Sequence, residues 1–423
     1  MSDSTASLVS DAPACATATD ALADVDYAAF AAEIDALGKR LNAARGPEDL
    51  VHQRRMERWG WICSVLGYGS AWIVFNPLSA LLIALGNTTR WAMVTHPVLH
   101  RAFDNVPEAP ERYRSRTFAR GWRRYFDWLD WLHPDAWIHE HNHLHHYHTG
   151  QVEDPDLVER NTRFIHRWPA PLRWLVGVFV IATWKLSYYA PNTYWSLKQH
   201  RRIRAQTAVE ARLEPLPTTG NVERWAIPGE KLWLPVSEWG LDFRLRCVAP
   251  YALMRFGLVP ALFLPFGQAA WFAVLCNSLL AEVLANVHTF FIIGPNHSGA
   301  DVPRFSNQCR GKAEFYVQQI VGTVNYPGGR DWKDYLQGYL NYQIEHHVWP
   351  DLPMLKYRQA APELKAICRR HGVPYVEESV FRRFAHTWAV MMGNAEPPRI
   401  DTSKRARPEL RAADASQPAA IGR

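Results

Sequence analysis

Histidine is concentrated in three short blocks of this chain. The blocks are residues 96–100 (HPVLH), residues 139–148 (HEHNHLHHYH) and residues 343–347 (QIEHH). Clustered neutral imidazoles bind iron, zinc, copper or nickel. The three blocks therefore indicate a transition-metal site.

The spacing within the first two blocks suits chelation. Residues i and i+4 lie on one face of an α-helix, one turn apart. His96 is therefore expected to bind a metal ion together with His100, and His141 together with His145. His146 then reaches toward a second metal ion.

The third block strengthens this interpretation. Gln343, His346 and His347 stand at i, i+3 and i+4 and again share one helix face. The nitrogen ligands are too many for one ion, so we predict two. A single histidine pair usually reflects packing, and a histidine run can be a loose chelating tract. Three blocks that each adjoin an apolar hairpin form a more specific pattern and favour the metal site.

The order His-x3-His, His-x3-His-His and Gln-x2-His-His resembles the histidine boxes of the membrane fatty acid desaturase and hydroxylase superfamily. Residues 341–353 (NYQIEHHVWPDLP) are similar to the third box of desaturases in which Gln replaces the first His, and residues 141–156 are similar to the second box. The resemblance covers residues 60–375. It implies an all-α integral membrane fold with four transmembrane helices as two hairpins, and a cytosolic helical cap that holds a histidine-ligated di-iron site.

The resemblance also implies an activity. The expected reaction is the O2-dependent insertion of a double bond into a fatty acyl chain, which is held in a tunnel as a thioester or a lipid-linked substrate. The implied cofactors are two non-haem iron ions, with O2 as co-substrate. An unactivated C–H bond needs such a cofactor, because no side chain supplies a comparable oxidant. A lipid hydroxylase on the same centre is the alternative, since the boxes do not separate the two reactions.

Gln343 stands where the family has a histidine, so one ligand is weaker, water-mediated or supplied elsewhere. In this family a further histidine from the last membrane helix often completes the set. His288 is the best match here, and His297 is its competitor. The predicted metal ligands are His96, His100, His141, His145, His146, His288, His346 and His347.

A ligating histidine also needs its other ring N–H held by an acceptor. Glu140, Asp154, Asp156 and Glu345 are the nearby candidates. The remaining histidines of the second block are expected around the site or on the surface, namely His139, His143 and His148.

Two pairs of apolar stretches must position these blocks. Residues 59–75 and 78–94 are separated by an Asn-Pro turn signal, and residues 248–264 and 269–293 by Pro-Phe-Gly. Each stretch has about the minimum length for crossing ~30 Å of hydrocarbon. The sequence thus predicts four spans as two hairpins. Pro97 disfavours helix at the residue before it, so a helix boundary is expected there.

The distribution of positive charge predicts the orientation. The two tight turns carry no Lys or Arg, whereas residues 101–124, 198–204 and 304–312 are rich in them. The basic segments, the histidine blocks and both termini are therefore expected on the cytosolic side. A further apolar run at 172–190 must then lie along the membrane interface, because a crossing would separate the second and third blocks. The basic segments could also hold an anionic acyl carrier or a lipid headgroup.

The remaining composition limits the partners. Lys and Arg exceed Asp and Glu by 47 to 41, a net charge of +6, and the chain has 19 Trp. This combination favours an anionic membrane face over nucleic acid. The chain has no Gly-x-Gly-x-x-Gly after a strand and no His-Pro-Gly-Gly haem signature, so a separate electron donor of ferredoxin or cytochrome type is expected. A metal transporter is the rival class, but the histidines lie outside the predicted spans.

The chain is predicted to have three parts. Residues 1–58 form a disordered segment followed by a surface helix at 27–45, residues 59–394 form the membrane domain, and residues 395–423 form a disordered tail.

Overall fold

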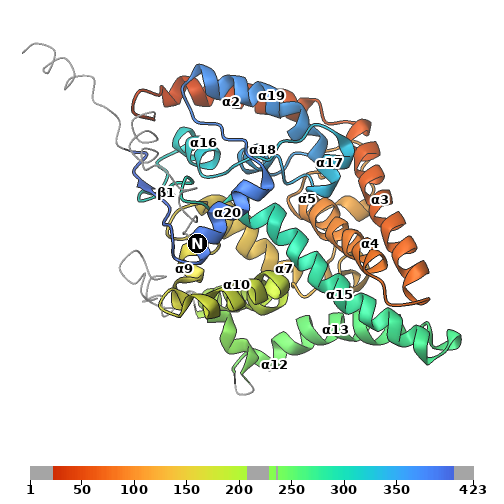
Figure 1. The fold of residues 1–423 in the computed structure, drawn as a ribbon. Coiled ribbons are helices and arrows are strands. Elements are labelled where there is room, and N and C mark those ends of the chain that lie inside the picture. The colour runs from red at the N-terminus through yellow and green to blue at the C-terminus, as the bar shows by residue number, and fades with distance from the viewer. Residues whose placement is uncertain (1–21, 207–227, 235–236, 404–423) are drawn as a thin grey trace, which may run out of the picture.

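The computed structural model describes residues 22–206, 228–234 and 237–403, and these residues are mostly helical (Figure 1). The predicted disorder at residues 1–21 and from residue 404 onward lies outside the described residues. The surface helix expected at 27–45 is α2 (Tyr27–Ala43). Part of the predicted tail is joined to the core, because strand β2 (Arg399–Ile400) pairs in parallel with β1 (Arg304–Phe305).

The first apolar pair forms a helical hairpin. Its helices and their continuation are α3 (Pro47–Ala71), α4 (Pro77–Thr88), the π-helical η1 (Thr89–Thr95) and α5 (His96–Leu99). The turn is fixed by Asn76, whose side chain accepts a hydrogen bond from the backbone N–H of Ser79 at 2.7 Å. The helices approach closely, since a Cβ added to Gly86 would lie 2.0 Å from Ser64 Oγ.

This hairpin runs without a break into the first histidine block, so the helix boundary predicted at Pro97 is absent. Proline lacks the N–H that would bond to the carbonyl one turn earlier. The side-chain amide of Gln53 donates to that carbonyl, Met93 O, at 2.8 Å instead. The helix therefore continues past Pro97, and the backbone N–H of His100 bonds to His96 O at 3.0 Å.

The second apolar pair is one long helix from Gly240 to Phe266 followed by α15 (Gln268–Ile293). Gly267 makes the turn between them with φ of +106°. The segments of the first helix are α12 (Gly240–Phe243), η8 (Arg244–Val248), α13 (Ala249–Ala252), η9 (Leu253–Leu258), α14 (Val259–Ala261) and η10 (Leu264–Phe266).

Two helices of the described residues, Gly240–Phe266 and Gln268–Asn296, are long and apolar enough to cross a membrane. They coincide with the predicted stretches 248–264 and 269–293. The first hairpin does not meet the same length and hydropathy criterion. The predicted number of four spans is therefore not confirmed.

The turn of the first hairpin is bonded to helix α15 of the second. The side chain of Asn277 on α15 donates to Ala71 O and Val74 O, at 2.9 and 3.1 Å, and accepts from the backbone N–H of Asn76 at 3.0 Å. Around it, Ile83 of α4 and Val274 of α15 belong to one buried apolar cluster. This contact gives the four helices one common framework.

The apolar run 172–190 lies in a continuous helix made of α10 (Ala170–Trp184), the π-helical η6 (Lys185–Tyr189) and α11 (Ala190–Gln206). This helix is not among those long and apolar enough to cross a membrane. Its Lys185 is buried, and Nζ lies 2.6 Å from Asp130 Oδ2 and 4.6 Å from the centre of the Trp91 ring. The charge is thus paired inside the protein.

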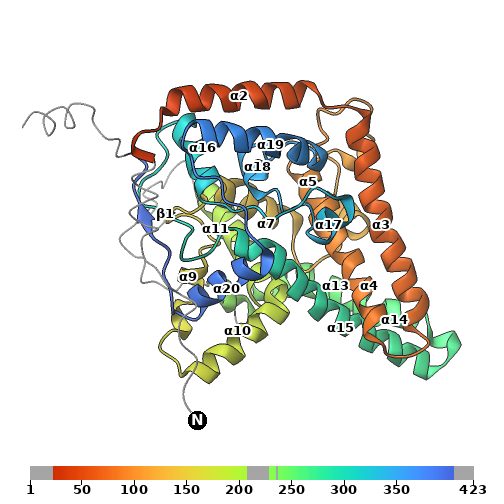
Figure 2. The same cartoon turned by 45° about the horizontal axis from the view of Figure 1, so that its top comes forward.

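The cap is built from the C-terminal third of the chain together with α2. Figures 1 and 2 show α2 lying along α19 at the top of the molecule, and Phe30, Ile344 and Leu364 belong to their shared buried core. The cap helices are α16 (Lys312–Val321), α17 (Asp331–Leu336), α18 (Gln343–Val348), α19 (Met354–Arg370) and α20 (Val380–Met391).

Short segments complete the described fold and carry the second block. They are η2 (Glu111–Tyr113), η3 (Gly121–Arg123), α6 (Arg124–Asp127), α7 (Pro134–Trp137), η4 (Ile138–His145), α8 (His146–His148), α9 (Val158–Asn161), η5 (Arg163–Ile165), η7 (Pro228–Trp233) and η11 (Gly294–Asn296).

Candidate metal centre

Eight histidines converge in the interior of the molecule. They form three overlapping groups, and within each group the ring nitrogens lie within 4.8 Å of one another. The groups are His96, His100, His141 and His346; His145, His297 and His347; and His146, His346 and His347. Because the groups share His346 and His347, they form one connected cluster.

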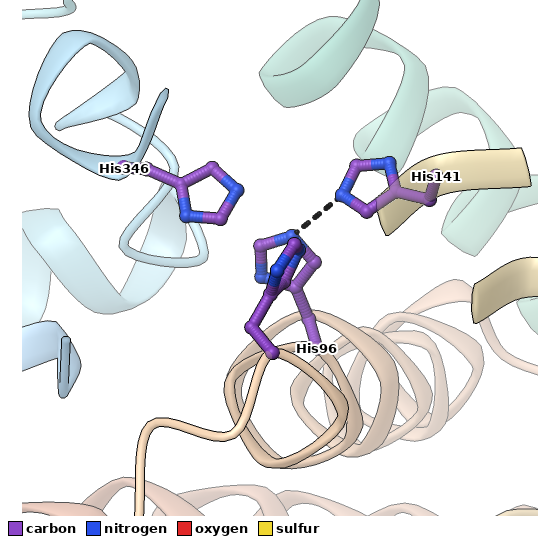
Figure 3. A group of neighbouring side chains, drawn as sticks. His96, His141 and His346 are labelled. Atoms are coloured by element: carbon purple, nitrogen blue, oxygen red, sulfur yellow. Dashed lines mark hydrogen bonds between the residues drawn. The ribbon is translucent and has the colours of Figure 1, made fainter. Parts of the chain in front are cut away.

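Separate elements present these imidazoles. In Figure 3, His96 of α5, His141 of η4 and His346 of α18 point toward a common centre. The Nε2 atoms of His96 and His141 lie 3.1 Å apart. This separation fits two ligands of one ion. His346 of the third block belongs to the same group, because the cap places α18 beside the first two blocks.

Six of the eight imidazoles have a buried ring nitrogen without a hydrogen-bond partner. These atoms are Nε2 of His100, His145, His346 and His347, and Nδ1 of His146 and His297. An unpaired buried polar atom costs about 1–3 kcal/mol. Burial also lowers the pKa of His96 to about 3 and that of His346 well below its usual value. Neutral imidazoles with free lone pairs are the form that binds transition metals, so the donor set fits such ions.

The opposite nitrogens of three imidazoles are held by hydrogen bonds. Nδ1 of His347 lies 2.8 Å from Gln319 Oε1, and Nδ1 of His346 lies 3.1 Å from the Tyr357 hydroxyl. That hydroxyl donates to Pro350 O, so it accepts from the histidine. These bonds place the proton on Nδ1 and leave Nε2 to face the centre.

Asp154 holds His145 in the same way. Its Oδ1 lies 3.0 Å from His145 Nδ1, whereas Oδ2 of Asp156 lies 3.8 Å from that atom. Burial alone would lower the pKa of His145, but the charge and hydrogen bond of Asp154 outweigh it and raise the pKa. This carboxylate therefore favours a proton on Nδ1.

The other two expected carboxylates do not contact a ligand candidate. Glu140 accepts from the Tyr189 hydroxyl at 2.9 Å, and Glu345 accepts from Asn325 and Tyr375. Sequence reasoning missed the partners Gln319 and Tyr357. Neither belongs to a histidine block, and no spacing pattern joins them to their histidines.

His141 and His145 were expected to bind one ion together, but the structure places them in different groups. Segment η4 is π-helical from Ile138 to His145. A π-helix has more residues per turn than an α-helix, so the i, i+4 phase of the prediction does not apply. His141 therefore joins the first block.

The structure does not bring His288 to the cluster. Its Nε2 lies 2.6 Å from Leu336 O. The competitor His297 reaches the cluster instead, because α15 ends at Ile293 and the chain turns back through η11. Nε2 of His297 lies 2.9 Å from Nε2 of Gln343, so the residue that replaces a family histidine contacts the additional one.

The three histidines expected outside the ligand set lie outside these groups. His143 is exposed, and the ring of His139 lies 4.4 Å from that of His200 between ring centres. Nδ1 of His148 lies 3.3 Å from Gln151 Oε1.

Comparisons with known proteins agree with the histidine pattern. The sequence model of the family described as fatty acid desaturase matches residues 70–379. The chain is similar to the NADPH-dependent stearoyl-CoA 9-desaturase of Mycobacterium tuberculosis, at 22% identity over 381 residues, which is 88% of this chain and 80% of the relative.

Two further relatives match shorter regions. The acyl-lipid (8-3)-desaturase of Rebecca salina is 37% identical over 145 residues, which is 34% of this chain and 32% of the relative. The acyl-lipid (9-3)-desaturase of Physcomitrium patens is 31% identical over 110 residues, which is 26% of this chain and 18% of the relative.

Proposed function

The chain belongs to the fatty acid desaturase family, and on that premise we propose that it inserts a double bond into a fatty acyl chain with O2 as oxidant at a centre of two iron ions. As a desaturase it is an oxidoreductase. The observation that carries the proposal is the set of unpaired, buried imidazole nitrogens that face one another.

The proposed ligand set is that of the three groups, with His297 in place of His288. The ligands are His96, His100, His141, His145, His146, His297, His346 and His347. Eight imidazoles suit two ions of ordinary coordination number. Bound iron would supply the oxidant that removes hydrogen from an unactivated C–H bond.

The side chains around the cluster position the ligands and exclude water. Asp154, Gln319 and Tyr357 each hold one Nδ1, which fixes both the ring orientation and the tautomer. The ring of Trp137 stacks on His141 with 4.5 Å between ring centres, and its side chain is buried. This lining keeps the site dry, as chemistry on an alkyl chain requires.

We also propose that both hairpins cross the membrane and that the cluster lies on its cytosolic side. The first hairpin carries exposed apolar side chains, with Val65 64% exposed and Leu66 56% exposed. Exposed apolar surface of this kind fits contact with lipid. The helix that contains residues 172–190 then lies at the interface. The substrate would be a fatty acyl thioester or an acyl lipid that reaches the site from the bilayer.

Expression in a host of simple lipid content, followed by mass spectrometry of the acyl products, tests the function. A product that has lost two hydrogen atoms supports a desaturase, and one that has gained an oxygen atom identifies a hydroxylase. The control is His347→Ala, which removes a proposed ligand and should form neither product. Elemental analysis of the purified protein should give about two iron atoms per chain, because eight imidazoles exceed the needs of one ion. One zinc ion without iron would overturn the proposal.

A further inference from the structure

Segment η4 has a second face that points away from the histidine cluster. His139 and His143 alternate along the chain with the buried His141 and His145, so they lie on the outer side of the same segment. There they line a surface hollow of about 330 Å³ between η4 and α11. This hollow is separate from the three histidine groups.

Three arginines and three histidines line the hollow. They are Arg120, His139, His143, His200, Arg201 and Arg204. Asp135 is the one acid among the lining residues, and it bridges Arg120 at 2.6 Å and Arg201 at 2.9 Å. One carboxylate is thus shared between the two guanidinium groups of Arg120 and Arg201.

The position of the hollow relates it to the proposed centre. A single helical segment separates it from His141 and His145, and a helix with its side chains is about 10–12 Å across. The basic groups are also accessible, since the side chains of Arg120 and Arg201 are 42% and 56% exposed. A protein docked over the hollow would thus be one helix away from the cluster.

The electron balance of the proposed reaction requires such a partner. Removal of two hydrogen atoms from the acyl chain provides two electrons, whereas reduction of O2 to two molecules of water consumes four. Two further electrons and two protons must therefore arrive in each turnover. A one-electron carrier protein provides them in two encounters and is itself oxidised by one electron in each.

We propose that the basic hollow between η4 and α11 is the docking site for the acidic surface of this one-electron donor protein. The inference rests on the proposed function. Opposite charges would steer the donor to the surface beside η4, which carries His141 and His145. A phosphate ion also carries negative charge that suits the arginines of the hollow, so phosphate binding there without donor binding is the contrary outcome.

Two neighbouring arginines of α11 give a matched pair of variants. Arg201 lines the hollow, whereas Arg202 pairs with Glu238 at 3.2 Å and does not line it, and both side chains are 56% exposed. The probe is a plant-type [2Fe–2S] ferredoxin with an acidic surface. Its affinity for the purified full-length enzyme is measured by calorimetry at several salt concentrations.

Arg201→Glu should weaken ferredoxin binding about tenfold at low salt and reduce its salt dependence, because it places a second carboxylate beside Asp135. Arg202→Glu should change the affinity less than about twofold, and Arg201→Lys should retain most of it. Product formation supported by ferredoxin is also compared with that supported by dithionite. This ratio should fall for Arg201→Glu and stay the same for Arg202→Glu.

Equal effects of Arg201→Glu and Arg202→Glu on ferredoxin affinity would overturn the docking site. So would loss of inorganic phosphate binding in Arg201→Glu with unchanged ferredoxin binding, which would identify a phosphate site. Failure of the proposed function has a different signature, because the wild-type protein would then form no desaturated product with either reductant.

Discussion

Asp154 holds His145 from a position that follows the second histidine block. Its Oδ1 accepts from His145 Nδ1, and Oδ2 accepts from the backbone N–H of Gly150. We expect Asp154→Asn to lower iron affinity about 10- to 100-fold, the usual effect of losing such a partner. Asp156→Asn is the matched control and should have a smaller effect, since its oxygen lies 3.8 Å away. Iron retention against a chelator measures both, and equal retention in the two variants would contradict the role of Asp154.

His297 and His288 provide the most direct test of the ligand set. His297→Ala should lower iron content and activity together, because its ring lies in the group with His145 and His347. His288→Ala should keep both, since His288 bonds to the backbone oxygen of Leu336. Elemental analysis of the two purified variants decides the question. The reverse result would return the ligand role to His288.

Among the helices, α20 fixes the loop that carries His297. The fully buried Arg383 of α20 donates to Ser298 O at 2.8 Å and to Asp301 Oδ2 at 2.5 Å. A Cβ on Gly299 would lie 2.4 Å from the Arg383 guanidinium, so a larger residue there would displace that guanidinium. Asp301, Glu378 and His386 lie close enough together to resemble a metal site. Both carboxylates, however, already form ion pairs with the Arg383 guanidinium. These acids therefore serve to hold Arg383, which in turn holds the loop that carries His297.

Loss of the Arg383 side chain should loosen the loop that carries His297. We expect Arg383→Ala to cost about 1–3 kcal/mol of folding free energy, because the buried backbone oxygens of Pro295 and Ser298 lose a hydrogen-bond donor, and to lower iron content through His297. Arg383→Lys should retain part of the folding free energy and part of the iron content. Arg382→Ala is the control on the same helix, since its side chain is 79% exposed. Thermal unfolding and iron analysis are the measurements. Full iron content in a folded Arg383→Ala protein would show that the loop holds its place without α20.

At the scale of the whole molecule, the position of the histidine blocks relative to the membrane is the main prediction. Both termini and all three blocks should be cytosolic, because the turns of both hairpins lack positive charge. Reporters fused after residue 150 and after residue 350 should therefore both read cytosolic. Opposite readings would mean that the helix containing residues 172–190 crosses the bilayer. A lumenal or periplasmic reading after residue 150 would reverse the orientation.

The sequence alone determined the family and most members of the histidine cluster. The desaturase family inferred from the three blocks is confirmed by the match over residues 70–379. Seven of the eight predicted ligands lie in the histidine groups. Sequence proximity sufficed to predict membership of the cluster, because a block of neighbouring histidines moves as a unit with its helix, although it did not predict which histidines share a group.

Only the tertiary structure decided which histidines share a group and which residues hold them. His141 separates from His145 because η4 is π-helical, and His297 replaces His288 because the chain turns back after α15. The partners Gln319 and Tyr357 come from the cap, and Gln53 compensates for Pro97 from the neighbouring helix. These contacts join segments that are distant in sequence, and their geometry depends on helix phase and packing, which local spacing does not encode.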